Sequence, residues 1–123
     1  MLFRSFVAVT GAATALDEAW GPEVVKRPGY RQALVETSVT LNAALTAWTL
    51  RSEVSSALRP GMSVVYGVYD LVSRFVRVPV DGLAHTENGD CGLHAPPEDA
   101  DGFRELSRRV ASSEYARELL DAS

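Results

Sequence analysis

Apolar side chains recur at helical spacing over the first twenty residues. Steps of four, three, four, three and four place one set on a single helical face: Leu2, Phe6, Val9, Ala13, Leu16 and Trp20. Gly21 and Pro22 follow at once, and they end a helix because glycine tolerates a left-handed backbone and proline cannot continue the helix. The pattern predicts a helix over residues 2–20, followed by a short turn over 22–26.

The longest stretch without a helix breaker lies between Pro28-Gly29 and Pro60-Gly61. It predicts a helix over residues 30–59, about 45 Å long at ~1.5 Å per residue. Its apolar residues form two stripes. One stripe contains Leu34, Leu41, Leu45 and Trp48, and the other contains Ala43, Ala47, Leu50, Val54 and Ala57. Two stripes indicate burial on two sides, as in a central helix.

The segment SVVYGVYDLVSRFVRVPV, residues 63–80, fits two structures. As a helix it separates an apolar side containing Val64, Val68 and Phe75 from a polar side containing Asp70 and Arg74. As a strand it would place Asp70 and Arg74 on the face of Val64 and Val68. Ser63 is also a favourable N-cap. We therefore predict a helix over residues 63–78, with a β-hairpin as the alternative because valine and tyrosine favour strands.

Residues 79–99 form a polar, acidic connector before the last helix. The carboxylates Glu98, Asp99 and Asp101 complement the positive end of a helix dipole, and they precede the apolar positions Phe103 and Leu106. This pattern predicts a helix over residues 100–121. The chain is thus expected to be all-α, a single domain of four helices with one long central helix and a polar connector before the last.

Length and charge narrow the function classes. A chain of 123 residues corresponds to one domain. Residues 1–80 carry eight basic and six acidic side chains, whereas residues 81–123 carry four basic and ten acidic ones, for a net charge of −4. Because no basic stripe with interleaved aromatic residues is present, we expect no nucleic-acid binding. The acidic C-terminal region is either a solvated surface or a face for a basic partner.

The cysteine count and the N-terminus bear on the compartment. Cys91 is the single cysteine, which excludes an intrachain disulfide and a disulfide-stapled secreted scaffold. The first fifteen residues imitate a signal peptide, but Thr10 and Gly11 interrupt the apolar run. We expect an intracellular chain and leave organelle or membrane association open. Residues 38–50 lack charge but are fewer than the roughly 20 needed to cross a bilayer, so membrane contact is expected only within a complex.

Within the connector, a stretch of ten residues contains three side chains of types that can bind zinc: His85, Cys91 and His94. A nearby carboxylate or a water would complete tetrahedral coordination. The spacing matches no common zinc finger, and an acidic connector that leads into a capped helix is the favoured interpretation of the stretch. No phosphate-binding loop, nucleophile elbow or metalloprotease motif is present, so an enzyme is disfavoured. A small zinc-binding protein or enzyme that uses this cluster is the alternative hypothesis.

Apolar helix faces favour a different function. The leading hypothesis is a non-enzymatic helical interaction protein, an accessory or adaptor subunit of a larger assembly. The candidate partner contacts are Trp20, Leu45, Trp48 and Val54, because tryptophan is enriched where binding energy concentrates and these residues lie on apolar stripes. Because both tryptophans lie on apolar stripes, packing in the chain's own core is favoured over partner binding for these two residues. The partner chain, including a second copy in a homo-oligomer, stays open.

Overall fold

The computed structural model describes residues 2–54, 63–69, 76–77 and 94–121. In order, its elements are the helix α1 (Leu2–Trp20), the 3-10 helix η1 (Pro22–Lys26), the helix α2 (Tyr30–Val54), the strands β1 (Val68–Tyr69) and β2 (Val76–Arg77), and the helices α3 (Ala100–Ala111) and α4 (Glu114–Asp121). Over these residues the protein is all-α with a long second helix, as the sequence predicts.

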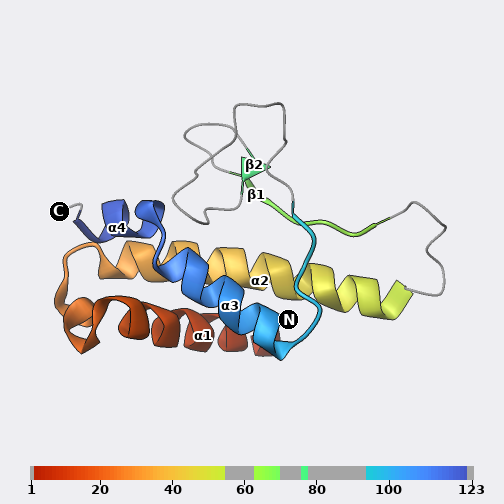
Figure 1. Cartoon of the computed structure of the whole chain (residues 1–123), viewed down its shortest axis with the longest axis horizontal. Helices are drawn as coiled ribbons and strands as arrows, with labels where there is room; N and C mark the ends of the chain where they lie inside the picture. Colours follow the sequence, from red (N-terminus) through yellow and green to blue (C-terminus); the bar gives the residue numbers. More distant parts are fainter. Residues whose placement is uncertain (1, 55–62, 70–75, 78–93, 122–123) are drawn as a thin grey trace.

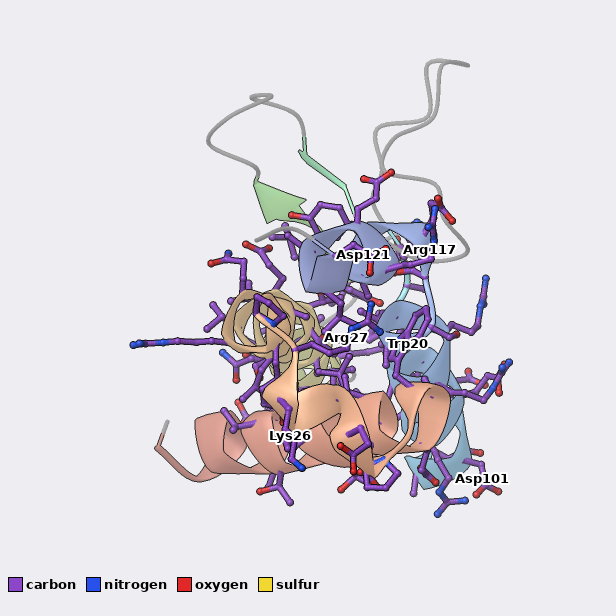
Figure 2. All side chains as sticks on the ribbon, turned by 90° about the vertical axis from the view of Figure 1, so that its left-hand side faces the viewer. Trp20, Lys26, Arg27, Asp101, Arg117 and Asp121 are labelled. Atoms are coloured by element: carbon purple, nitrogen blue, oxygen red, sulfur yellow. The ribbon has the colours of Figure 1, made fainter. Side chains whose placement is uncertain are left out.

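The helices α1 and α2 run side by side as an antiparallel pair joined by η1 (Figure 1). α3 lies along both of them, and α4 lies near the start of α2. The view turned by 90° shows α3 and α4 together on one side of this pair (Figure 2). The described helices therefore form a two-layer arrangement in which one side of the α1–α2 pair is covered.

The end of α1 agrees with the prediction to the residue. Gly21 adopts φ 88°, a conformation that glycine reaches without steric cost, and its N–H donates to the Asp17 carbonyl at 2.8 Å. Pro22 then opens η1, where its missing N–H is not needed. This short element turns the chain and buries Val24 against the core.

The core consists of three clusters of mostly small or aliphatic residues. The cluster at the η1 end contains Ala15, Leu16, Val24, Ala33, Ala111 and Leu120. The second contains Ala8, Ala12 and Leu41, and the third contains Ala44, Ala47 and Tyr66. Alanine at so many contacts lets the helix backbones approach closely, so the layers are held by many short contacts rather than by a few large side chains.

The prediction of a helix over residues 63–78 is wrong in the described part. Val68 pairs with Arg77 and Tyr69 with Val76 in an antiparallel ladder, and Tyr66 forms a separate bridge to His94. The β-hairpin alternative therefore holds where the structure can be described. Valine and tyrosine favour extended backbone, and pairing with His94, a residue distant in sequence, adds hydrogen bonds that local periodicity does not reveal.

The predicted last helix, residues 100–121, is two helices separated at Ser112 and Ser113. The Ser113 hydroxyl accepts from the Ala116 N–H at 3.1 Å and donates to the Val110 carbonyl at 2.7 Å, so it caps α4 and satisfies the end of α3. Asp99 caps α3 by accepting from the Gly102 N–H. Residues 55–59 of the predicted second helix, and residues 79–93 of the predicted connector, lie outside the described residues.

Candidate interaction surface on the second helix

One face of α2 carries apolar side chains that the described helices leave exposed. Val35, Val39 and Leu50 are exposed to 47%, 44% and 49%. Asn42 and Thr46 lie between them on the same face, because positions 35, 39, 42, 46 and 50 follow each other at steps of three or four. We call these five residues the open face of α2.

The rest of α2 explains why this face points outward. The opposite side is buried against α1, α3 and α4 through seven side chains: Ala33, Thr37, Ser38, Thr40, Leu41, Ala44 and Ala47. A helix that is buried along one side must present its remaining positions away from that core. The hydroxyl of Thr46 donates to the Asn42 carbonyl at 2.8 Å, so this donor is satisfied within the open face itself.

Charged residues stand only at the two ends of this helix face. Arg31 precedes the open face and Glu53 follows it, and both side chains are exposed. Within the described residues, neither Arg31 nor Glu53 forms an ion pair. Arg51 points elsewhere and donates to the carbonyls of Pro96 and Pro97, at 3.3 and 3.0 Å. The open face is therefore an uncharged strip with a cation at one end and an anion at the other.

The predicted partner contacts lie on other parts of the helices. Trp20 is half-buried, donates from its indole N–H to the Ala111 carbonyl at 2.7 Å, and packs below the Arg27 guanidinium. Trp48 is 37% exposed and meets the Phe103 ring edge-on, with 6.3 Å between the ring centroids. Leu45 is half-buried against Ala8, Ala12 and Leu41. Val54 is half-buried at the end of α2. Partner binding by these four residues stays a prediction.

Sequence reasoning missed Val35 and Val39. Both valines have polar or charged neighbours in the chain, and they fall outside the two stripes used to interpret this segment. In the second stripe Ala43 and Ala47 pack near Tyr66, whereas Leu50 is exposed. The available signal was the spacing of Val35, Val39, Asn42 and Thr46, which marks a third side of the same helix.

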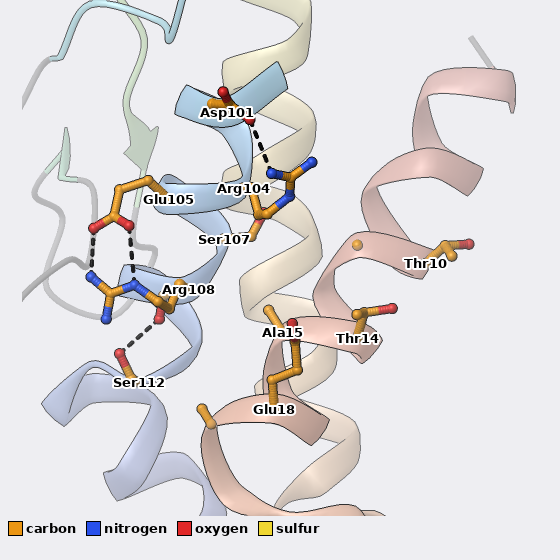
Figure 3. A pocket seen from close by; sticks show the side chains of 12 residues that line it. Thr10, Thr14, Ala15, Glu18, Asp101, Arg104, Glu105, Ser107, Arg108 and Ser112 are labelled. Atoms are coloured by element: carbon orange, nitrogen blue, oxygen red, sulfur yellow. Dashed lines mark hydrogen bonds and ion pairs between the residues drawn. The ribbon is translucent and has the colours of Figure 1, made fainter. Parts of the chain in front are cut away.

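A groove between α1 and α3 has a volume of about 730 Å³ (Figure 3). Its α3 wall carries charges that are already paired, Arg104 with Asp101 at 3.0 Å and Arg108 with Glu105 at 3.1 Å. Its α1 wall includes Gly11, Ala15, Thr14 and Glu18 among others. The Ser112 hydroxyl in its lining donates to the Arg108 carbonyl at 2.7 Å.

Tyr66 is the buried titratable group nearest a second, smaller cavity of about 260 Å³. Its backbone exchanges two hydrogen bonds with His94, at 2.8 and 2.9 Å. Burial raises the pKa of Tyr66 to about 12, and the positive charge of Arg109 opposes part of this increase. The phenol is therefore protonated at neutral pH and is unsuited to act as a base there.

The predicted zinc cluster can be placed only in part. His85 and Cys91 lie outside the described residues. His94 is exposed and is positioned by its backbone pairing with Tyr66. Among the residues described, no three potential ligands gather as a metal would require. Zinc binding by His85, Cys91 and His94 stays a prediction.

Two broader observations complete this picture. Within the described parts of the chain, every helix is too short or too polar to cross a lipid bilayer. Comparison with protein-family models, with curated proteins and with solved structures finds no match to this chain.

Proposed function

We propose that this chain is a non-enzymatic helical interaction protein, an accessory or adaptor subunit of a larger assembly, and that the open face of α2 binds a partner chain. The observation that carries the proposal is the exposure of Val35, Val39 and Leu50 along one face of the longest helix. Removing such apolar surface from water stabilises an association by about 25 cal/mol per Å².

The rigidity of α2 supports the same proposal. The helix packs against α1, α3 and α4, and Arg51 ties it to the segment that leads into α3. A partner would meet a face that is already ordered, so binding would lose little conformational entropy on this side. Support for catalysis is weaker over the described residues, because Tyr66 is protonated and the arginines on the α3 wall of the α1–α3 groove pair with Asp101 and Glu105.

Replacing one valine of the open face tests the proposal. Val39→Asp places a carboxylate in the contact, whereas Val25→Asp makes the same change at a valine of η1 that is 56% exposed and lies off the open face. We expect Val39→Asp to release the chain from its assembly, because a buried carboxylate without a partner is strongly unfavourable. The measurement is the size distribution of the tagged chain after gentle extraction from its own source.

The matched control should behave like the parent protein. Val25→Asp is expected to stay in the assembly, and far-ultraviolet circular dichroism should show the same helix content for both variants. If Val39→Asp keeps the parent's size distribution, the open face does not bind a partner and the proposal fails.

A further inference from the structure

We infer that the partner of the open face is a second copy of this chain, paired antiparallel through α2. This inference rests on the proposed function and names the occupant of that face. Positions 35, 39, 42, 46, 49 and 53 are separated by steps of four, three, four, three and four, the spacing at which two helices pack along a shared seam. The spacing extends along nearly the whole described helix.

The seam is self-complementary when one helix is reversed. Two antiparallel copies related by a two-fold axis between positions 42 and 43 place Val35 opposite Leu50 and Val39 opposite Thr46. A contact of this kind uses the same patch on both copies, as a closed dimer requires. The apolar side chains of each copy thus face the apolar or uncharged side chains of the other.

The charges at the ends of the open face fit the same arrangement. Arg31 and Glu53 are 22 positions apart, about 33 Å along a helix at ~1.5 Å per residue. Reversing one helix brings Arg31 of each copy to Glu53 of the other, and both side chains are exposed without an ion pair inside the described chain. A parallel pair would instead place Arg31 beside Arg31 and Glu53 beside Glu53, so charge selects the antiparallel orientation.

The polar residue at the axis supports this register. Asn42 is half-buried, and in the dimer it would meet Asn42 of the second copy, where the two amides can bond each other. A polar residue that meets its own copy across a helix seam fixes register at some cost in affinity. Because one pair of helices buries less than the about 1,200–2,000 Å² of a stable complex, we expect a reversible dimer that forms with increasing concentration.

The first test reverses the charges at positions 31 and 53 in the purified full-length chain and measures the affinity of the dimer. Sedimentation equilibrium should show a monomer–dimer equilibrium that Arg31→Glu or Glu53→Arg alone weakens by about tenfold, since each places like charges together twice per dimer. The combined variant Arg31→Glu/Glu53→Arg should restore the parent affinity. Salt alone does not decide the matter, because it weakens these pairs and also screens repulsion between two chains of net charge −4.

Cross-linking at the axis is the second test. Helices packed about 8–10 Å apart bring facing Cα atoms within the about 4.4–6.8 Å that a disulfide spans. In a Cys91→Ser background, Asn42→Cys should give a disulfide-linked dimer on mild oxidation, and Val25→Cys, exposed but off the seam, should not.

Several results would overturn the inference. The first is a chain that stays monomeric at all concentrations. The second is a dimer whose affinity is unchanged by both charge reversals and that forms no disulfide through Asn42→Cys. The third is a monomer that instead sediments with phosphatidylcholine–phosphatidylglycerol vesicles. A monomeric purified chain whose native assembly is still lost in Val39→Asp would leave the proposed function standing and remove only the second copy. An assembly that survives Val39→Asp would remove the proposed function itself.

Discussion

Tyr66 joins three parts of the described chain. It packs on Ala44 and Ala47 of α2, pairs through its backbone with His94, and lies near Arg109 of α3. Burial raises the pKa of its phenol to about 12 because the charged form is poorly solvated there. The residue therefore reports on whether the segment around position 66 stays docked on the helices.

This shift predicts a loss of stability at high pH. The phenol has a pKa of about 10 in an unfolded chain, so between pH 10 and 12 the unfolded chain releases a proton that the folded chain retains. The free energy of unfolding should be unaffected below pH 10 and should fall by up to about 1.4 kcal/mol per pH unit as the pH rises toward 12. Urea unfolding at a series of pH values measures this slope.

The phenol itself gives an independent readout. One of the four tyrosines should ionise last in an ultraviolet absorbance titration, and Tyr66→Phe should remove both that late step and the added slope. A late step that persists in Tyr66→Phe would assign it to another tyrosine and contradict the prediction.

Single residues also show where sequence reasoning reaches its limit. Trp20 and Trp48 attract attention as interface residues, yet Trp20 is held by Ala111 and Arg27, and Trp48 meets Phe103. The valines at positions 35 and 39 fall outside the predicted stripes, yet they are 47% and 44% exposed on one face of α2. Size and hydrophobicity are properties of one residue, whereas exposure depends on which neighbours the fold supplies.

At the scale of the element, local signals predicted some boundaries and not others. The helix α1 begins and ends where the apolar spacing and Gly21-Pro22 indicate, because both signals lie within the segment. The segment around 63–69 was misinterpreted because its bridge to His94 depends on a residue almost thirty positions away. The division of α3 from α4 was missed because Ser113 acts as a cap only where the chain changes direction.

The docking of α4 on the start of α2 predicts opposite effects for two glycine substitutions. A Cβ atom on Gly29 would lie 1.7 Å from the Leu119 carbonyl oxygen, so Gly29→Ala must displace α4 and should destabilise the protein by about 3 kcal/mol or more. A Cβ atom on Gly11, within α1, would lie 3.8 Å from Leu41 Cδ1, which is an ordinary contact. Gly11→Ala should therefore stabilise the protein by up to about 1 kcal/mol through helix propensity.

Thermal or urea unfolding of the two variants checks this pair. The control is built in, since both changes add one methyl group to a glycine. Equal effects on the free energy of unfolding, or a stabilised Gly29→Ala, would show that α4 does not sit against Gly29.

At the scale of the whole molecule, the all-α class could be predicted and the open face could not. The two stripes of α2 indicated burial on two sides, and the chain itself covers part of both, through α1, α3, α4 and the segment at Tyr66, whereas Leu50 of the second stripe stays 49% exposed. What remains exposed follows from the placement of α3 and α4 on one side of the α1–α2 pair. That placement depends on long-range packing, which hydrophobic periodicity within one helix does not specify.

The metal content of the intact chain tests the alternative hypothesis, which is that the chain is a small zinc-binding protein or enzyme. Zinc held by His85, Cys91 and His94 would appear in native mass spectrometry as one zinc ion per chain after purification without chelators. Cys91→Ser should then lose it, because a thiolate ligand would be missing. The same metal content in parent and variant would contradict zinc binding by Cys91.

The contacts of Trp20 with Ala111 and of Arg27 with Asp121 join residues 91 and 94 positions apart. About sixty residues separate the end of α2 from the start of α4, so a ribosome adding about 5–20 residues per second exposes α1 and α2 for about 3–12 s before α4 emerges. The face that carries Val35, Val39 and Leu50 is complete as soon as α2 is made. Two neighbouring nascent chains can therefore meet through this helix before either has closed its own core.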